Sequence, residues 1–199
     1  MSGAADHHVE AALRHDAIVL AGGRARRLGG ADKPGLMVGD TTLLDRVIAA
    51  GAAADSVIVV GAERATAREV RWARESPPGG GPVAALAAGL PLVAADLVVV
   101  LAADLPFLDP TTVAALVAAA TADSDGALLV DGQGRDQLLA GAWSTSALRA
   151  ALADLGEPAG ASFRALVGGL RYTRVPAPAG VPWLDVNCQD DLQRARERS

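Results

Sequence analysis

Short apolar runs alternate with amphipathic stretches along this chain, and the two patterns define the elements we expect. The apolar runs are continuous, which is typical of parallel strands buried on both faces. The most apolar run is Leu97–Ala102, and we expect it at the centre of the sheet. Stretches such as Leu43–Ile48 instead place apolar residues at helical spacing. This order of elements predicts an α/β fold with a mostly parallel sheet.

The expected elements follow one another in regular order. We expect strands at Ala17–Ala21, Ser56–Val60, Glu69–Arg74, Leu97–Ala102, Gly126–Val130, Gln137–Trp143 and Arg171–Val175. We expect helices at Thr41–Ala53, Val83–Leu92, Ser144–Leu155 and Asp190–Arg198, and one that Asp109 or Thr111 caps and that reaches Ala120. Because no repeat or long linker divides the chain, we expect residues 16–199 to form a single domain after a disordered N-terminal extension, residues 1–15.

Composition narrows the class of protein. Of the 199 residues, 51% are hydrophobic but only 3% aromatic, so the core must consist of Ala, Val and Leu. The net charge of -5 argues against general binding to nucleic acid or to an anionic membrane. A single cysteine, Cys188, excludes an internal disulfide and fits a reducing cytoplasm. No uninterrupted apolar run reaches the roughly 18 residues that span a bilayer. Residues 1–15 lack a cationic region followed by an apolar block, so we do not expect them to be a signal peptide.

A glycine- and arginine-rich segment follows the first expected strand. Gly22 and Gly23 have no Cβ, so the backbone can turn sharply and bring N–H groups close to an anion. Four cationic residues come next: Arg24, Arg26, Arg27 and Lys33. Guanidinium and ammonium groups suit the oxygens of a polyphosphate. The plainer interpretation is a strand-to-helix turn with solvated arginines, but the lysine and the density of charge favour a phosphate site.

Two standard phosphate loops do not fit this segment. A P-loop needs Gly-Lys followed by Ser or Thr, and that tripeptide is absent from the sequence. The dinucleotide fingerprint needs Gly-x-Gly-x-x-Gly and an acidic residue at the end of the second strand. Gly22-Gly23 does not match that spacing, and the second expected strand is followed by Gly61. The segment is therefore a different kind of nucleotide loop.

Asp104 is the leading candidate for a metal ligand. It lies just beyond Leu97–Ala102, where open α/β sheets bind ligands, and Pro106 stiffens the chain after it. Mg²⁺ takes hard oxygen ligands, commonly one or two carboxylates together with phosphate oxygens. The alternative role for Asp104 is to cap a turn, or the helix that begins near Asp109.

Two further segments carry candidate residues. Asp185 and Asn187 are two apart on an extended stretch, so both oxygens can reach one ion or phosphate, although Asn187 could instead cap the last helix. Gly79–Gly81 precedes Pro82 at the start of a helix, and such glycines let a base or ribose lie against the backbone. Without more information this stretch is a loop with Pro at the first helical position.

These segments together resemble a known enzyme family. Leu20-Ala21-Gly22-Gly23, with Arg27, Gly29 and Lys33 at their spacing, is similar to the signature loop of nucleotidyltransferases with a Rossmann-like core. This form of the loop most resembles the molybdenum cofactor guanylyltransferases, the MobA-like NTP transferases. The stretches at Gly79–Pro82, Asp104–Phe107 and Asp185–Asn187 are similar to later segments of that family.

The resemblance implies a three-layer Rossmann-like nucleotidyltransferase fold and a Mg²⁺-dependent reaction. GMP would pass from GTP to molybdopterin with release of pyrophosphate. The partners it implies are molybdenum-insertion proteins or target molybdoenzymes. We expect no binding to nucleic acid or to a membrane, and we expect the protein in the cytoplasm. It implies catalytic roles for Arg27, Lys33 and Asp104, with Asp104 on the metal. The nucleotide would be bound by Leu20, Ala21, Gly22, Gly23, Lys33, Gly81 and Asp104, with the backbone amides of residues 21–23 around the phosphates, and Asp185 and Asn187 would hold the acceptor or a second metal.

Two departures from the family pattern bear on the choice of base. The guanylyltransferases typically have Asn where this chain has Gly61, and Asp where it has Ser76. Glu75, one residue earlier, could replace the missing carboxylate if the backbone shifts by one. Two alternatives therefore remain open. One is a cytidylyltransferase or another NTP transferase acting on molybdopterin or a sugar phosphate, and the other is a non-catalytic nucleotide-binding relative.

Overall fold

The computed structural model describes residues 13–22, 32–178, 186 and 189–198. Four predicted site residues, Gly23, Arg27, Asp185 and Asn187, lie outside these ranges. The division into an extension at 1–15 and a domain at 16–199 stays a prediction, because residues 1–12 are also outside them. Within the described part, no helix is long and apolar enough to cross a membrane.

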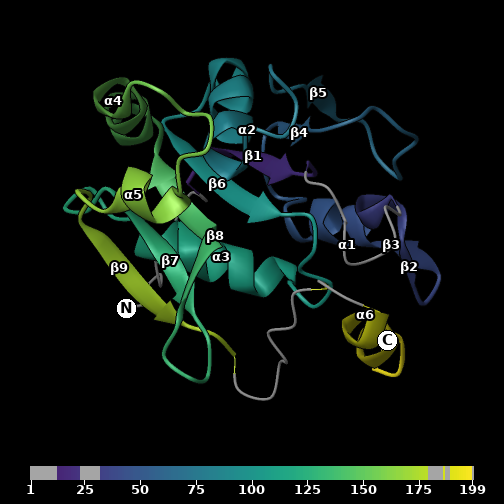
Figure 1. Cartoon of the computed structure of the whole chain (residues 1–199). Helices are drawn as coiled ribbons and strands as arrows, with labels where there is room; N and C mark the ends of the chain where they lie inside the picture. Colours follow the sequence, from purple (N-terminus) through teal and green to yellow (C-terminus); the bar gives the residue numbers. More distant parts are fainter. Residues whose placement is uncertain (1–12, 23–31, 179–185, 187–188, 199) are drawn as a thin grey trace, which may run out of the picture.

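A seven-stranded sheet forms the middle of the described structure (Figure 1). Its strands, in spatial order, are β5 (Arg71–Ala73), β4 (Val57–Val60), β1 (His15–Leu20), β6 (Leu97–Ala102), β8 (Asp136–Ser144), β7 (Gly126–Val130) and β9 (Tyr172–Pro176). β8 runs antiparallel to both of its neighbours, and the other pairings are parallel. The predicted mostly parallel sheet is confirmed, with β6 at its centre.

Helices cover both faces of the sheet, so the fold has three layers. The helices are α1 (Leu43–Ala50), α2 (Pro82–Gly89), α3 (Pro110–Ala119), α4 (Thr145–Leu155), α5 (Phe163–Val167) and α6 (Gln189–Arg196). Apolar residues of α1 and α3 share one core cluster with one face of the sheet, and α2, α4 and α5 share a second cluster with the other face. Ala, Val and Leu make up most of both clusters, as the composition predicts, and Trp143 is the largest fully buried side chain.

Side-chain caps fix where several helices begin. The Asp109 carboxylate accepts from the Thr112 N–H at 2.7 Å, so Asp109 rather than Thr111 caps α3. Thr42 caps α1 through the N–H of Asp45, and Ser144 caps α4 through the N–H of Ala147. Because a cap residue stands outside its helix, α1 and α4 begin slightly later than predicted.

The structure adds elements that the apolar pattern did not predict. A small hairpin pairs β2 (Met37–Val38) with β3 (Thr41–Thr42) around Gly39, whose φ is 60°. α5 is the other addition, and it is too short to display helical periodicity. The helix expected to reach Ala53 ends at Ala50, after which Gly51 donates back to Val47.

The C-terminal helix α6 packs on the β2–β3 hairpin rather than on the main sheet. Leu192 and Ala195 of α6 share a third core cluster with Val38, Leu43 and Val186. Arg196 also donates from Nε to the Met37 carbonyl at 3.0 Å. As Figure 1 shows, this places α6 on the side of the molecule where α1 and the small hairpin lie. The end of the chain therefore closes against the segment that follows the glycine- and arginine-rich loop.

Candidate functional site

A cavity of about 540 Å³ opens at the carboxyl ends of β1 and β6. β4 pairs with one edge of β1 and β6 pairs with the other edge, so the strand order reverses at β1. Open α/β sheets bind ligands at such a reversal. The lining residues that the argument uses are Leu20, Ala21, Gly22, Lys33, Glu75 and Asp104.

The end of β1 supplies one wall of the cavity. Leu20 and Ala21 are buried, and the Leu20 carbonyl accepts from the N–H of Ala103 at 3.1 Å. The N–H of Ala21 donates to the Val60 carbonyl at 2.9 Å, so it belongs to the sheet. The expectation that the Ala21 amide surrounds a phosphate is therefore wrong, because a sheet hydrogen bond already occupies that donor.

Lys33 and Asp104 meet at the cavity although they are far apart in the sequence. The Lys33 Nζ lies 2.5 Å from the Asp104 Oδ2, and 19% and 24% of the two side chains are exposed. Lys33 begins a 3₁₀ turn that reaches Gly35, and Asp104 follows β6. Lys33 is also the single lysine of the whole sequence, and all the other residues counted as Lys or Arg are arginines. A compact ammonium and a carboxylate thus lie together at this cavity, and the first suits a phosphate oxygen while the second suits a cation.

The N-terminus of α2 forms the opposite wall. Gly81 precedes this helix with φ 94° and ψ -177°, a conformation that is essentially restricted to glycine. Pro82 occupies the first turn, and the Gly81 carbonyl accepts from the N–H of Ala85 at 3.0 Å. Gly79, with φ 87°, lines the same wall. The glycines therefore shape this wall, as a close approach of ligand to backbone requires.

Glu75 also faces this cavity, whereas Ser76 is exposed and outside its lining. The Glu75 Oε1 accepts from the N–H of Gly79 at 2.8 Å and lies 3.5 Å from an ideal Cβ built on Gly22. Its Oε2 is buried and has no hydrogen-bond partner among the described residues. A buried carboxylate oxygen without a donor is costly unless a ligand supplies one.

Gly61, the other departure from the family pattern, has a packing reason. A Cβ at this position would lie 3.0 Å from the Ala21 carbonyl oxygen and 3.2 Å from the Ala21 Cβ. A larger residue would push against the end of β1. Gly61 therefore serves the close approach of two strand ends.

The late segment reaches the site through its backbone. The N–H of Val186 donates to the Asp104 carbonyl at 3.2 Å, and Val186 is fully buried. The predicted residues Asp185 and Asn187 flank Val186 but lie outside the described residues, as do Gly23 and Arg27. Of the predicted site residues that are described, all line one cavity: Leu20, Ala21, Gly22, Lys33, Gly81 and Asp104.

The donor set suits a metal that arrives with a phosphate ligand. Among the described residues, no group of three or more His, Cys, Asp or Glu side chains could hold a metal ion by itself. Asp104 offers one partly exposed carboxylate at the cavity. That matches the usual Mg²⁺ arrangement of one or two carboxylates completed by substrate phosphates.

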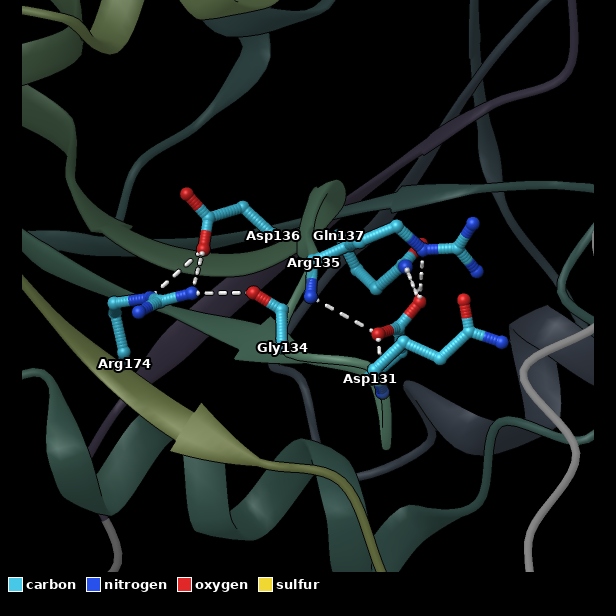
Figure 2. Close-up of polar contacts among 7 residues, drawn as sticks. Asp131, Gly134, Arg135, Asp136, Gln137 and Arg174 are labelled. Carbon is cyan, nitrogen blue, oxygen red and sulfur yellow. Dashed lines mark hydrogen bonds and ion pairs between the residues drawn. The ribbon is translucent and has the colours of Figure 1, made fainter.

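A second polar cluster lies on the β7–β8 hairpin (Figure 2). The Asp131 carboxylate accepts from the backbone N–H groups of Gln133 and Arg135 and from the side chains of Arg135 and Gln137. The Arg135 N–H is the largest cause that holds the pKa of Asp131 below its ordinary value, while burial acts in the opposite direction. From β9, Arg174 donates to Asp136 and to the Gly134 carbonyl. Each Asp131 oxygen has two donors, so this cluster is structural.

Comparisons with known proteins identify the family. A model of the MobA-like NTP transferase domain matches residues 17–174. A curated molybdenum cofactor guanylyltransferase from Bradyrhizobium sp. (strain ORS 278) is 34% identical over an alignment of 194 positions, which covers 89% of this chain and 90% of that protein.

Two solved structures share the fold. A homologue of Mycobacterium tuberculosis Rv0371c from Mycobacterium sp. strain JC1 is 27% identical, with a TM-score of 0.75 over 94% of this chain and 98% of that one. A 2-C-methyl-D-erythritol 4-phosphate cytidylyltransferase from Thermus thermophilus is 22% identical, with a TM-score of 0.68 over 94% and 98%. The second likeness concerns the fold alone, so the fold by itself does not select the base.

Proposed function

This chain belongs to the family of MobA-like NTP transferases, and we propose that it transfers GMP from GTP to molybdopterin and releases pyrophosphate. The observation that carries the proposal is the pairing of Lys33 with Asp104 in a cavity at the carboxyl ends of β1 and β6. The acceptor comes from the name of the Bradyrhizobium relative. A cytoplasmic location belongs to the same proposal.

The reaction is a substitution at phosphorus. An oxygen of the molybdopterin phosphate attacks the α-phosphorus of GTP, and the bond to the α,β-bridging oxygen breaks with its electron pair leaving on pyrophosphate. A phosphate monoester is largely ionised near pH 7, so the attacking oxygen needs no general base. Lys33 offsets charge on the phosphates, and Arg27 would add to this. Positioning and charge neutralisation then supply most of the rate.

Asp104 is the residue that would hold Mg²⁺. When bound there with the nucleotide, the ion supplies neutralisation of the phosphate oxygens around the α-phosphorus. Asp104 keeps its carboxylate at the cavity through Lys33 and through the backbone contact with Val186. Asp185 and Asn187, on either side of Val186, are the residues proposed for the acceptor.

Glu75 supports guanine as the base. Guanine presents an imino N–H and an amino N–H side by side, and both are donors. The buried Glu75 Oε2 is an acceptor without a donor among the described residues, in the same cavity wall. Cytosine offers one amino donor beside two acceptors, which a carboxylate does not match. Buried polar groups that lose their partner discriminate strongly between ligands.

A Mg²⁺-dependent binding screen tests the proposal. Calorimetry with GTP, CTP, ATP and UTP is run on the wild type, on Asp104→Asn and on Asp123→Asn, an exposed carboxylate elsewhere that serves as the matched control. We expect GTP to bind the wild type and the control alike and to bind Asp104→Asn at least roughly tenfold more weakly. Preference for CTP would favour the cytidylyl alternative, and binding of no nucleotide would contradict the proposal. GTP binding without Mg²⁺-dependent release of pyrophosphate in the presence of the acceptor would favour a non-catalytic nucleotide-binding relative.

Inosine triphosphate isolates the role of Glu75. It lacks only the guanine amino group, so we expect it to bind the wild type about tenfold more weakly than GTP. In Glu75→Gln the two nucleotides should bind alike. Equal binding of both to the wild type would contradict a contact between Glu75 and the base.

A further inference from the structure

The turn that carries Lys33 is attached to the loop between β4 and β5 by an ion pair. Arg64, in that loop, donates from Nη1 to the Asp32 carboxylate. Only 19% of the Arg64 side chain is exposed, against 64% for Asp32. Asp32 stands at the start of the 3₁₀ turn, but its side chain makes no capping hydrogen bond there. The carboxylate therefore serves the contact with Arg64 rather than the turn.

Gly35 leaves room for this ion pair. An ideal Cβ on Gly35 would lie 2.6 Å from the Asp32 Oδ2 and 3.3 Å from the Arg64 Nη1. The first distance is too short for any real side chain, so a residue larger than glycine would displace the carboxylate. Asp32, Gly35 and Arg64 thus form one packed contact, which we call the Arg64 contact.

The loop that presents Arg64 is held independently of Asp32. The N–H of Ala67 donates to the Asp45 Oδ1 at 2.8 Å, and the hydroxyl of Thr42 donates to the Asp45 Oδ2 at 2.7 Å. Asp45 lies in the first turn of α1. The guanidinium therefore reaches Asp32 from a loop that is fixed to a helix.

Charge gives the Arg64 contact a consequence for the cavity. Asp32 is the sequence neighbour of Lys33, and Asp104 is the ion-pair partner of that lysine. A carboxylate beside a triphosphate site repels the phosphates and competes for the lysine. Arg64 offsets the charge of Asp32, and the paired Asp32 is not among the residues that line the cavity. Lys33 then remains with Asp104, where the phosphates would bind.

We infer that Arg64 is a positioning residue for nucleotide binding, which acts on Lys33 by neutralising and holding Asp32. The inference rests on the proposed nucleotide site. Arg64 itself touches no phosphate in this arrangement. The loss caused by removing Arg64 must therefore depend on whether Asp32 is present.

A double-mutant cycle tests that dependence. The Kd of Mg²⁺·GTP is measured by calorimetry for the wild type, Arg64→Ala, Asp32→Ala and the double variant. Arg68→Ala is the control from the same loop, because the Arg68 side chain donates to the Ala52 carbonyl and not to Asp32. We expect Arg64→Ala to weaken binding about fivefold, because the unpaired charge of Asp32 near the surface would repel the phosphates by about that factor. Asp32→Ala, the double variant and Arg68→Ala should stay within about twofold of the wild type.

Two further variants separate positioning from folding. Arg64→Lys keeps the charge and should recover most of the affinity, and Gly35→Ala should weaken binding without any change of charge. Melting temperatures are recorded for every variant. Equal losses from Arg64→Ala with and without Asp32 would overturn the inference, as would no loss at all. If the wild type binds no nucleotide, the proposed function fails and this inference fails with it.

Discussion

At the scale of single residues, lysine and arginine make different contacts in this chain. Arginines bind carbonyls and carboxylates across the molecule, as Arg46 does with Val38 and Arg174 with Asp136. The single lysine lies at the cavity against Asp104. An ammonium is a compact charge with rotatable donors, so it can pass from a carboxylate to a phosphate, whereas a guanidinium favours a fixed two-pronged geometry.

Replacing Lys33 is expected to impair catalysis far more than stability. Lys33→Ala removes a partly exposed ion pair, which is worth about 0–1 kcal/mol. Under the proposed function it also removes the charge that would stabilise the phosphates in the transition state, so turnover should fall about 10²- to 10³-fold. Pyrophosphate release and thermal melting measure the two effects.

The single lysine allows an independent check. An amine-selective reagent modifies Lys33 and the chain's amino terminus only, so GTP with Mg²⁺ should protect one of two sites. Lys33→Arg, which keeps the charge, should lose that site while it retains its fold. Modification of Lys33 at the same rate with and without the nucleotide would contradict a phosphate contact.

At the scale of elements, the β7–β8 hairpin shows how a turn is fixed by a single carboxylate. Its strands change register between Leu128 and Leu129, so the ladder alone does not set the turn. Asp131 does so by accepting hydrogen bonds from both backbone and side chains of the turn (Figure 2). Arg174 then joins the hairpin to β9. These contacts hold the turn of the hairpin against β9 at this edge of the sheet.

Acid should weaken this arrangement. The pKa of Asp131 is lowered in the folded state, chiefly by the Arg135 N–H, so its contribution to stability is present above the ordinary Asp pKa of about 4 and is lost as the pH falls through the lowered value. Asp131→Asn should therefore unfold at less urea than the wild type at about pH 7. The difference in urea midpoint between the variant and the wild type should shrink below about pH 4. A constant difference from about pH 7 to below about pH 4 would exclude the Asp131 charge as its cause.

At the scale of the whole molecule, the C-terminal helix packs outside the main sheet, next to the residue that contacts Asp104. α6 packs on the β2–β3 hairpin, and Val186, just before it, is bonded to the backbone of Asp104. Packing of α6 therefore bears on the position of Val186 beside Asp104.

A buried leucine in α6 tests this coupling. Leu192 is 2% exposed, and Leu192→Ala should lower the free energy of unfolding by about 2–5 kcal/mol. Turnover should fall as well, even below the melting temperature, because the segment beside Asp104 loses its support. Leu148→Ala, on α4 and 0% exposed, is the control: it should destabilise to a similar extent and leave turnover of the folded protein unchanged.

The sequence by itself determined the order of the seven strands of the main sheet along the chain and the bounds of β6. Continuous apolar runs predicted the strands, since parallel strands are buried on both faces. Asp104 was identifiable because a carboxylate after the central strand must lie at the carboxyl edge of the sheet. The cap of α3 was narrowed to Asp109 or Thr111 because a cap bonds only to its own helix, and the structure decided for Asp109. All these signals are local.

Only the tertiary structure decided which distant residues meet. Lys33 and Asp104 are 71 residues apart, and Arg64 and Asp32 belong to loops that the sheet order brings together. Glu75 rather than Ser76 faces the cavity because of how the backbone leaves β5, and the Ala21 amide is bonded to β4. Such contacts depend on strand order and on the direction in which each side chain points. No local pattern carries that information, because it arises only when separate elements pack against one another.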